Sequence, residues 1–399
     1  MSRILAGPTA TQLLADLGAE VIKIERPGQG DDTRGWGPPF LRDERGAETG
    51  ESAYFLSANR GKHSVAVNIA DPRGQDIVKA LVAQADVLVE NFKPGDLARY
   101  GLDFETLSRL NPRLVYCSVT GFGQTGPNAE RAGYDFLVQG EGGLMSLTGE
   151  ADGPPMKAGV GIADVLCGMY AAVGILAAIE ARHVSGTGQH IDIALMDAQV
   201  AMLINQGVGY LTDGKVPPRR GNDHPAIVPY GTFPASDGSF ILAIGNDAQF
   251  ARFVAAAGAP GLFRDARFAT NADRVRNREV LIPLLSALTE GRSVAEWLAI
   301  CAAETVPAGP VNDLGQVFGS PQVVARGMRV RLPHAAARGR SVELIGNPLH
   351  LSRTPVTYDK APPVLGEDTG AVLSRLMGLE PGDLRALRAA GVIGGGLGE

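Results

Sequence analysis

Short apolar segments alternate with helical segments through the first third of this chain. Residues 8–18 and 71–85 have helical spacing of apolar residues, whereas 20–25, 64–69, 86–92 and 114–123 have strand character. This alternation is typical of a parallel sheet with helices on its faces. Ligands of such sheets bind beyond the carboxyl ends of the strands. The sequence therefore predicts a site near Glu25–Arg26, Asn91–Lys93 and Thr120–Gly123.

The middle of the chain predicts a second, smaller domain. Residues 213–232 are rich in proline, glycine and arginine, which favours a domain boundary near 214–225. The segments that follow have strand character at 240–246 and helical character at 247–257, 272–290 and 294–304. Strand character returns at 327–332 and 342–352. We therefore expect a large domain formed by residues 1–213 and 320–399, and a small α/β domain formed by 214–319.

The composition limits the class of protein. The chain has 399 residues, 45% hydrophobic and 20% charged, as in a soluble globular protein. Its net charge of −6 disfavours nucleic-acid binding. Cys117, Cys167 and Cys301 lack metal-ligand spacing, so we expect no metal site and a reducing, cytoplasmic location. We expect no membrane association, because the apolar run at 165–179 is short and interrupted by glycines.

One acidic residue, Asp164, stands out in the stretch from Pro154 to His183. The stretch becomes an alanine-rich helix whose apolar side is predicted to include Val165, Met169, Val173, Leu176 and Ile179. Asp164 lies at its first turn, where N–H groups and the helix dipole favour an ionised carboxylate. A partly exposed carboxylate of this kind can attack an activated carbonyl. The alternative is that Asp164 only caps the helix.

Two other features suggest different chemistry. Residues 121–126 (GFGQTG) match a dinucleotide-binding fingerprint, but Pro127 follows at once and no helix is expected there. The match also comes late in the sheet, so it disfavours a nicotinamide-dependent oxidoreductase. Cys167 lies three residues after Asp164 and could be a catalytic thiol, although a small buried residue is the favoured interpretation.

Several dispersed motifs together resemble one family. They are residues 5–39 (LAGPTATQLLADLGAEVIKIERPGQGDDTRGWGPP), 59–69 (NRGKHSVAVNI), 89–95 (VENFKPG), 120–127 (TGFGQTGP), the Asp164 helix and 362–369 (PPVLGEDT). In this order they resemble class III CoA-transferases of the CaiB/BaiF type, such as the formyl-CoA and carnitine CoA-transferases. The resemblance implies a large Rossmann-like domain, a smaller inserted domain and an interlocked, ring-like homodimer.

The resemblance gives Asp164 a chemical role. The family nucleophile is an aspartate in the pattern G-x-x-x-x-D-x-x-x-G, which residues 159–168 match. The family exchanges CoA between an acyl-CoA and a free carboxylate through an aspartyl anhydride and an aspartyl-CoA thioester, so CoA is a substrate and no permanent cofactor is expected. An α-methylacyl-CoA racemase is the alternative, but those enzymes read G-H-D where this chain has Tyr134 between Gly133 and Asp135. A non-catalytic CoA-binding relative is a further alternative.

The resemblance also implies CoA contacts. Arg26 and Arg99 would meet the adenine or the phosphates, and the other contacts are Leu5, Ala6, Val67, Asn68, Ile69, Ala70, Asn91, Phe92, Lys93, Tyr134 and Asp135. Backbone N–H groups at Gly142 and Gly143 are candidate oxyanion donors. Residues 219–233 resemble members that act on dicarboxylates, so Arg220 and His224 are candidates for binding a second carboxylate. We expect succinyl-CoA as donor and a dicarboxylic acid as acceptor.

The beginning of the sequence departs from the family pattern. Members usually carry a leading strand, roughly G-hydrophobic-V-L-D-L, before the segment that matches Leu5–Pro8. This sequence reads Met1-Ser2-Arg3 at that place. Two alternatives follow: translation starts further upstream, or the sheet has a different edge.

Overall fold

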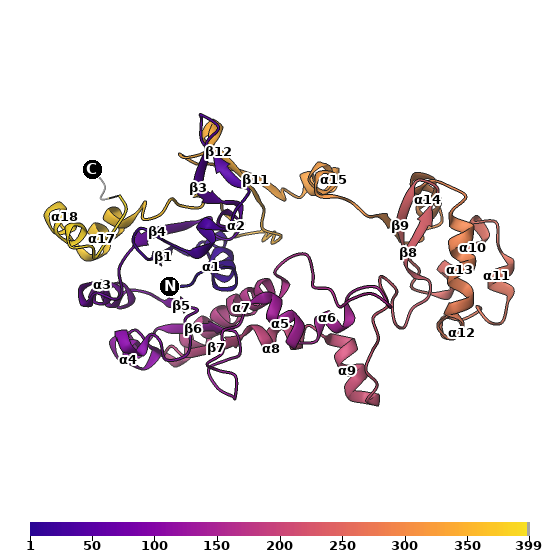
Figure 1. Ribbon diagram of the computed structural model, residues 1–399, viewed down its shortest axis with the longest axis horizontal. Helices are drawn as coiled ribbons and strands as arrows, with labels where there is room; N and C mark the ends of the chain where they lie inside the picture. The colour runs from indigo at the N-terminus through magenta and orange to yellow at the C-terminus, as the bar shows by residue number, and fades with distance from the viewer. Residues whose placement is uncertain (397–399) are drawn as a thin grey trace. The chain divides into compact units, whose positions relative to one another are not determined.

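The computed structural model describes residues 1–396, which divide into two compact units (Figure 1). The first unit comprises Met1–Leu144, Lys157–Asp213 and the described part of Gln322–Glu399. The second comprises Met145–Met156 and Gly214–Pro321. Each unit is described below by itself.

The first unit contains two parallel sheets. In one sheet, β1 (Val21–Glu25) pairs with β4 (Lys62–Ala66). In the other, β6 (Val115–Thr120) lies between β5 (Val87–Glu90) and β7 (His190–Ala194). The predicted mixed α/β class with parallel strands is confirmed. The expectation of one continuous sheet is wrong, because the described residues contain no ladder that joins β1 to β5.

Two helices pack closely in this unit because the residues between them are small. Gly168 in α7 (Ile162–Ser185) lies against α1 (Ala6–Asp16), and a Cβ at Gly168 would come within 2.6 Å of the Ala6 carbonyl oxygen. The predicted apolar stripe of α7 is largely wrong. Met169, Val173 and Leu176 are 49%, 64% and 47% exposed, whereas the buried face carries alanines, Cys167 and Gly168. Small residues allow two helices to approach closely. The face of α7 that is buried against α1 therefore depends more on small side chains than on hydrophobic ones.

Helices from both ends of the chain complete the first unit. The α3 helix (Pro72–Val82) is capped by Asp71, as predicted, and its buried side shares a core with α17 (Thr369–Met377) and α18 (Pro381–Ala389). The remaining helical segments are α4 (Phe104–Leu110), α5 (Asp135–Glu141), α8 (Leu195–Ala201), α9 (Ile204–Asp213), α16 (Pro321–Ala325) and the 3-10 turns Ala98–Tyr100 and Arg338–Arg340. The short helix α6 (Leu144–Leu147) begins at Leu144, and its other residues belong to the second unit.

The segment 26–52, which has only loop character in sequence, forms part of the fold. It contains a 3-10 turn, η1 (Asp32–Gly35), and the antiparallel pair β2 (Phe40–Arg42) and β3 (Glu48–Ser52). The short helix α2 (Ala53–Ser57) follows β3. A second hairpin pairs β11 (Arg329–Pro333) with β12 (Ser341–Ile345).

The second unit has its own core. Its antiparallel sheet has the strand order β10 (Ala308–Pro310), β9 (Gly238–Ala243) and β8 (Tyr230–Ala235). Phenylalanines and Trp297 fill the space between the sheet and its helices. Those helices are α10 (Asp247–Ala256), α11 (Gly261–Arg264), α12 (Asn271–Arg276), α13 (Arg278–Thr289), α14 (Val294–Ala303) and α15 (Leu314–Gly319).

By length and composition α7 could cross a membrane, and it is the one described helix that meets this test. A buried core helix meets the same test, so a single such helix is weak evidence for a membrane span. Here α7 packs against α1 and β6 inside the first unit.

Candidate active site

Asp164 lies in the first turn of α7 and is 7% exposed. The capping position is taken by Gly161, and the Asp135 carboxylate accepts a hydrogen bond of 2.9 Å from the Ala163 N–H. The alternative that Asp164 is the helix cap is therefore wrong. The hydrogen bond from the first turn of α7 goes to Asp135 and not to Asp164. The Asp164 carboxylate is therefore available for chemistry.

The sequence predicts an ionised Asp164 carboxylate, whereas the structure favours partial protonation of Asp164 near neutral pH. Burial, and next the negative charge of Asp135, raise the pKa of Asp164 to about 7. Within residues 1–396 no side chain or N–H group donates a hydrogen bond to its carboxylate. The expected stabilisation by helix N–H groups does not occur because Asp135 accepts from them. Near neutral pH Asp164 thus exists in both protonation states, and its deprotonated form is a poorly solvated nucleophile.

Asp135 is held in place from its other side. It begins α5, and its Oδ2 accepts a 2.7 Å hydrogen bond from Gln139 Nε2. The Gln139 amide oxygen accepts in turn from the Ala158 N–H at 2.8 Å. This chain of contacts fixes the loop that leads into α7. Asp135 is therefore a positioning residue for Asp164 as well as a residue predicted to contact CoA.

The charge of Asp135 should be visible in the pH dependence of the reaction. The sequence-based expectation that Asp164 is a nucleophile requires its deprotonated form, so it predicts that kcat/KM rises with pH and levels off above about pH 7. In Asp135→Asn the negative charge is removed while an acceptor oxygen remains, so the midpoint of this rise should move to lower pH. Glu105→Gln on exposed α4 is the matched control and should leave the midpoint unchanged. Identical midpoints in Asp135→Asn and the wild type would refute this electrostatic coupling.

The sequence analysis did not predict a role for Tyr54 and Trp36, an aromatic pair whose Tyr54 lies near these carboxylates. Burial, together with the charges of Asp164 and Asp135, raises the pKa of the Tyr54 phenol. The Trp36 ring meets Tyr54 edge to face, with 5.2 Å between ring centroids. Trp36 lies in the quoted motif 5–39, but only the fold brings it into contact with Tyr54. These two rings are candidates for contacting the acyl group.

A cavity of about 530 Å³ lies at the carboxyl end of β1 and β4. Seven of the residues predicted to contact CoA are among those that line it. These are Arg26, Val67, Asn68, Ile69, Ala70, Phe92 and Arg99. The location agrees with the rule that ligands of parallel sheets bind beyond the carboxyl ends of the strands. The structure thus brings together residues that are up to 73 positions apart in sequence.

The charged groups of this cavity suit an anionic ligand with an aromatic part. Arg99 is exposed and its guanidinium lies 4.7 Å from the Tyr100 ring centroid. Arg26 is exposed and donates to the Gln29 side chain at 3.1 Å. Arg3, which the sequence did not suggest as a site residue, pairs with Asp32 on the same wall. Arginines bind phosphates through paired N–H groups and stack on flat rings.

The other residues predicted to contact CoA are not among those that line the cavity. The Asn91 side chain bonds both to the N–H and to the carbonyl of Arg3, at 3.0 and 2.7 Å. Lys93 and Tyr134 are exposed. Ala6 is buried at the start of α1, and Leu5 precedes it.

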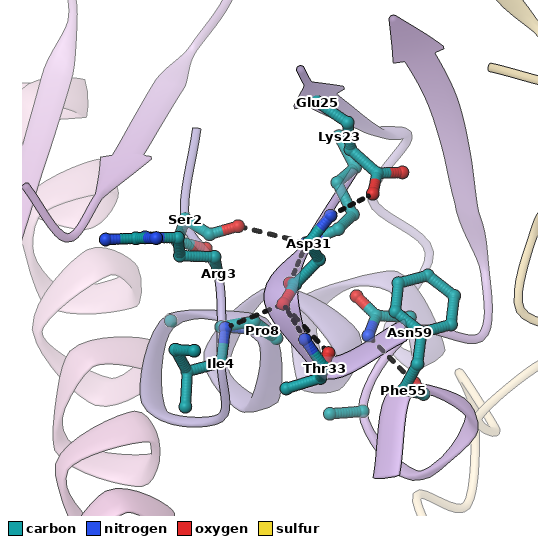
Figure 2. A network of polar contacts seen from close by, with 12 residues as sticks. Ser2, Arg3, Ile4, Pro8, Lys23, Glu25, Asp31, Thr33, Phe55 and Asn59 are labelled. Carbon is teal, nitrogen blue, oxygen red and sulfur yellow. Dashed lines mark hydrogen bonds and ion pairs between the residues drawn. The ribbon is translucent and has the colours of Figure 1, made fainter. Parts of the chain in front are cut away.

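A buried network fixes the chain segment between this cavity and Asp164 (Figure 2). Asp31 accepts hydrogen bonds from the Ile4 N–H at 3.1 Å and from Thr33, and it pairs with Lys23 at 2.8 Å. Ile4 has a φ of 70°, which is strained for a branched residue and costs about 1–3 kcal/mol. The next residue, Leu5, lies so close to Gly161 that an added Cβ there would be 3.1 Å from it. The network therefore links the wall of the cavity to Gly161, the residue at which α7 begins.

The glycine pair predicted to stabilise the oxyanion lies at the end of α5. Gly142 is buried, and a Cβ there would come within 2.4 Å of the Gln199 side chain. Gly143 has a φ of 86°, which favours glycine. The Gly142 N–H donates to the Val138 carbonyl at 2.7 Å, and the Gly143 N–H donates to the Gly140 carbonyl at 3.3 Å. Both N–H groups are therefore engaged at the end of α5, which does not support the prediction that they are oxyanion donors.

Arg220 and His224 lie in the second unit, whereas Asp164 lies in the first. Arg220 is exposed, and the His224 ring tilts against Tyr230 with 5.3 Å between centroids. Arg278 donates to the His224 carbonyl at 3.2 Å. These contacts fix the local loop.

The alternative chemistries gain no support from the local geometry. The glycine-rich residues 121–126 form turns, and the next helix begins only at Asp135. Burial raises the pKa of the Cys167 thiol, which favours its interpretation as a packing residue. Residues 1–396 contain no cluster of three or more His, Cys, Asp or Glu side chains suited to a metal ion.

The comparison with known proteins assigns the family. The family model described as CoA-transferase family III matches residues 1–369. The chain belongs to CoA-transferase family III. A succinate–glutarate CoA-transferase of Agrobacterium fabrum is 48% identical over 380 residues, covering 95% of this chain and 94% of that protein. A mouse succinyl-CoA:glutarate CoA-transferase is 42% identical over 393 residues, covering 98% and 88%.

A solved structure agrees with this assignment. The crystal structure of a CaiB/BaiF family protein from Brucella suis has a TM-score of 0.83 and 47% identity to this family III chain. The match covers 94% of this chain and 97% of that one. The resemblance stated from the motifs is confirmed. These relatives carry no racemase name, so the transferase interpretation is the one supported.

Proposed function

We propose that this family III enzyme transfers CoA from succinyl-CoA to a dicarboxylate such as glutarate, with Asp164 as the nucleophile. The two transferases at 48% and 42% identity are named for succinate or succinyl-CoA and glutarate. The observation that carries the proposal is the buried Asp164 carboxylate, which lies in the same unit as the arginine-lined cavity and is joined to it by residues 2–5.

In the proposed reaction, an Asp164 oxygen attacks the thioester carbonyl of succinyl-CoA, the C–S bond breaks and CoA thiolate leaves. The thiolate then attacks the Asp164 carbonyl of the resulting anhydride, which releases succinate and forms an aspartyl-CoA thioester. The acceptor carboxylate attacks this thioester, expels the thiolate and forms a second anhydride. The thiolate attacks the acceptor's carbonyl, which forms the new acyl-CoA and restores Asp164. Covalent steps of this kind divide one difficult exchange into easier ones.

The other predicted residues have supporting roles in this proposal. The first unit is the Rossmann-like CoA-binding domain, and its cavity at Arg26 and Arg99 holds the nucleotide. Arg220 and His224 recognise the second carboxylate of the substrate. CoA acts as a substrate only, and we propose a cytoplasmic location in keeping with three unpaired cysteines.

Removing one arginine of the cavity should weaken binding of the CoA substrate. Arg99→Gln is expected to raise KM for succinyl-CoA about tenfold, since one charge-assisted hydrogen bond contributes about 1.5 kcal/mol, and to leave kcat nearly unchanged. Arg109→Gln, on the exposed side of α4, is the matched control and should behave as wild type. Steady-state kinetics with a saturating acceptor measures both values. An unchanged KM in Arg99→Gln would remove this residue from the CoA site.

We also propose that the chain works as an intertwined homodimer. The large apolar side chains Met169, Val173 and Leu176 of α7 are exposed within this single chain. Apolar faces of this kind on a soluble protein are typical of subunit interfaces. Analytical ultracentrifugation of the wild type should give twice the chain mass, and Val173→Glu should shift it toward the monomer. A wild-type monomer at micromolar concentration would contradict the proposal.

The proposed activity is tested by following product formation directly. The protein is incubated with succinyl-CoA and, in separate reactions, glutarate, another dicarboxylate or acetate, and acyl-CoA products are measured by liquid chromatography and mass spectrometry. The proposal predicts glutaryl-CoA and little acetyl-CoA. Absence of transfer to every dicarboxylate, together with α-proton exchange of a branched acyl-CoA in deuterated water, would support a racemase instead.

A further inference from the structure

One fully buried side chain on α5, Gln139, uses both ends of its amide. Its Nε2 donates to the Asp135 carboxylate at 2.7 Å and to the Val160 carbonyl at 3.5 Å. Its Oε1 accepts a hydrogen bond from the Ala158 N–H at 2.8 Å. The exposed fraction of Gln139 is 0%, so water does not compete for these bonds. Gln139 therefore joins α5 to the segment that leads into the neighbouring helix α7 (Figure 1).

This contact lies where the chain returns from the second unit to the first. Residues 145–156 belong to the second unit, and Ala158 is the second residue after the chain re-enters the first unit. Within the second unit the segment is attached to another loop, since the Gly149 carbonyl accepts a hydrogen bond from the Gly221 N–H at 3.0 Å. The bond between Ala158 and Gln139 therefore anchors the chain at the base of this excursion, before α7 begins.

The Asp135 carboxylate is held from two sides. Oδ2 accepts from Gln139, and Oδ1 accepts from the Ala163 N–H at 2.9 Å. An ionised carboxylate only accepts hydrogen bonds, whereas a peptide N–H only donates them. An amide can donate to the carboxylate of Asp135 and accept from the N–H of Ala158 at the same time. These donors favour the charged form of Asp135, and this is the charge that acts on Asp164.

Few charges act on the Asp164 carboxylate. After burial, the charge of Asp135 is the cause that raises the pKa of Asp164. Tyr54 on α2 and Cys167 on α7 also interact with Asp164, but both are neutral near pH 7 because burial raises the pKa of each. In the described part of the chain, the other elements packed against α7, which are α1, α8, β6 and β7, add no charge that shifts this pKa. Gln139 can therefore change the protonation of Asp164 by acting on Asp135.

We propose that Gln139 is a positioning residue for CoA transfer, which holds Asp135 against the first turn of α7 and thereby sets the position and the ionisation of Asp164. This inference rests on the proposed function, in which Asp164 is the nucleophile. Gln139 makes no contact with the substrate in this account. Its amide keeps the Asp135 carboxylate ionised and close, and its bond to Ala158 keeps the segment before α7 in place. An attacking carboxylate must be oriented closely for reaction, so loss of these contacts lowers kcat.

Replacing Gln139 with methionine tests this role, because methionine keeps the length of the side chain and makes neither hydrogen bond. The titration of Asp164 is followed by NMR of enzyme labelled with carbon-13 at its aspartate carboxyls, and Asp164→Asn identifies the signal. Without its donor, Asp135 binds a proton more readily or turns to solvent. The midpoint for Asp164 is therefore expected to fall by about one pH unit in Gln139→Met.

Two further measurements on Gln139→Met follow from the same contacts. Amide hydrogen exchange in residues 158–163 should become about tenfold faster, because the Ala158 N–H loses its acceptor. The kcat for CoA transfer should fall about tenfold while KM for succinyl-CoA stays nearly unchanged, since orientation of the nucleophile is lost and substrate contacts are kept.

Two controls separate positioning from a general loosening of the fold. When Gln139→Met is added to Asp135→Asn, the midpoint for Asp164 should not move further, because the charge through which Gln139 acts is already absent. Gln12→Met removes another buried glutamine, whose amide also bonds at both ends to backbone groups, at the end of α2 and just after it. It should lower stability without moving the midpoint for Asp164.

Gln139→Glu covers the case in which the methionine variant does not fold. A glutamate at this buried position beside Asp135 retains a proton, so it keeps both a donor and an acceptor. The midpoint for Asp164 should then stay at or above that of the wild type. A lower midpoint in Gln139→Glu would overturn the proposal.

The remaining outcomes also decide the question. An unchanged midpoint and unchanged exchange in Gln139→Met would refute the role of Gln139. A shift of the same size in the wild-type and Asp135→Asn backgrounds would refute it too, because the effect would not pass through Asp135. A wild-type enzyme that transfers no CoA would refute the proposed function instead, and the titration and the exchange would still decide whether Gln139 positions Asp135 and Asp164.

Discussion

Replacing Asp164 with asparagine is expected to reduce kcat for CoA transfer by on the order of 10³-fold or more. The amide cannot form an anhydride, so the covalent route is lost and only binding and orientation remain. Binding of CoA should change little, because Asp164 does not line the arginine cavity. Single-turnover kinetics with succinyl-CoA and glutarate measures the effect.

The stability of Asp164→Asn separates loss of chemistry from loss of fold. The pKa of Asp164 is raised to about 7 in the folded protein, against about 3.9 in an unfolded chain. Between these values the folded state binds more protons, so the unfolding free energy falls as pH rises, by a few kcal/mol at pH 8. Asparagine does not titrate in this range, so the unfolding free energy of the variant does not fall in this way. The variant should therefore be inactive and more heat-stable than the wild type at pH 8, with the difference disappearing below about pH 4.

Cys167→Ala is the matched control for the nucleophile. This thiol is buried three residues away on the same helix, and burial raises its pKa. The alanine variant should retain most activity and lose some stability. Full activity in Asp164→Asn, or loss of activity in Cys167→Ala with the fold intact, would contradict the assignment of the nucleophile.

Replacing Arg34 with methionine is expected to lower the unfolding free energy by about 3–5 kcal/mol. Arg34 is buried and pairs with Glu25 and Glu51, each at 2.8 Å. Burial alone would raise the pKa of Glu25, but hydrogen bonding and charge from Arg34 and the charge of Lys23 lower it below its usual value. Methionine keeps the contact with the Phe55 ring, which lies 3.7 Å from the guanidinium carbon, and removes the charge. Glu25 would then keep only the nearby charge of Lys23, and Glu51, whose pKa burial already raises to about 7, would lose its cation.

Arg42→Met provides the control for this prediction. Arg42 also pairs with a glutamate, Glu48, but both side chains are about half exposed. Exposed pairs contribute about 0–1 kcal/mol, so urea denaturation should show little change. A loss below about 1 kcal/mol in Arg34→Met would show that the buried pairs do not stabilise the fold.

Local patterns were sufficient to predict much of the fold and the position of Asp164. The helices near 8–18, 71–85 and 247–257 and the strands near 20–25 and 114–123 form close to their expected bounds, because each depends on its own apolar period and capping residues. Asp164 lies in the first turn of α7, as the glycine-rich stretch before it predicted. The arginines and apolar residues expected to hold CoA converge because the strand ends converge.

Features that depend on distant residues could not be predicted in this way. The first-turn N–H of α7 is satisfied by Asp135, and the Glu25 carboxylate pairs with Arg34 and accepts a hydrogen bond from the Ser64 hydroxyl. The spacing of residues within one segment does not reveal such pairs, because the two partners lie in different segments of the chain. The buried face of α7 was predicted from side-chain hydrophobicity, whereas contact with α1 requires small residues. The division of the sheet follows from which strands are neighbours, and that information is absent from any single segment.

Trapping the covalent intermediate tests the account most directly. The protein is incubated with succinyl-CoA and hydroxylamine, digested and mapped by mass spectrometry, with Asp164→Asn treated in parallel. Hydroxylamine converts an aspartyl anhydride or thioester to a hydroxamate. The account predicts a hydroxamate at Asp164 in the wild type and none in the variant. An unmodified Asp164 in a preparation that transfers CoA to glutarate would contradict it.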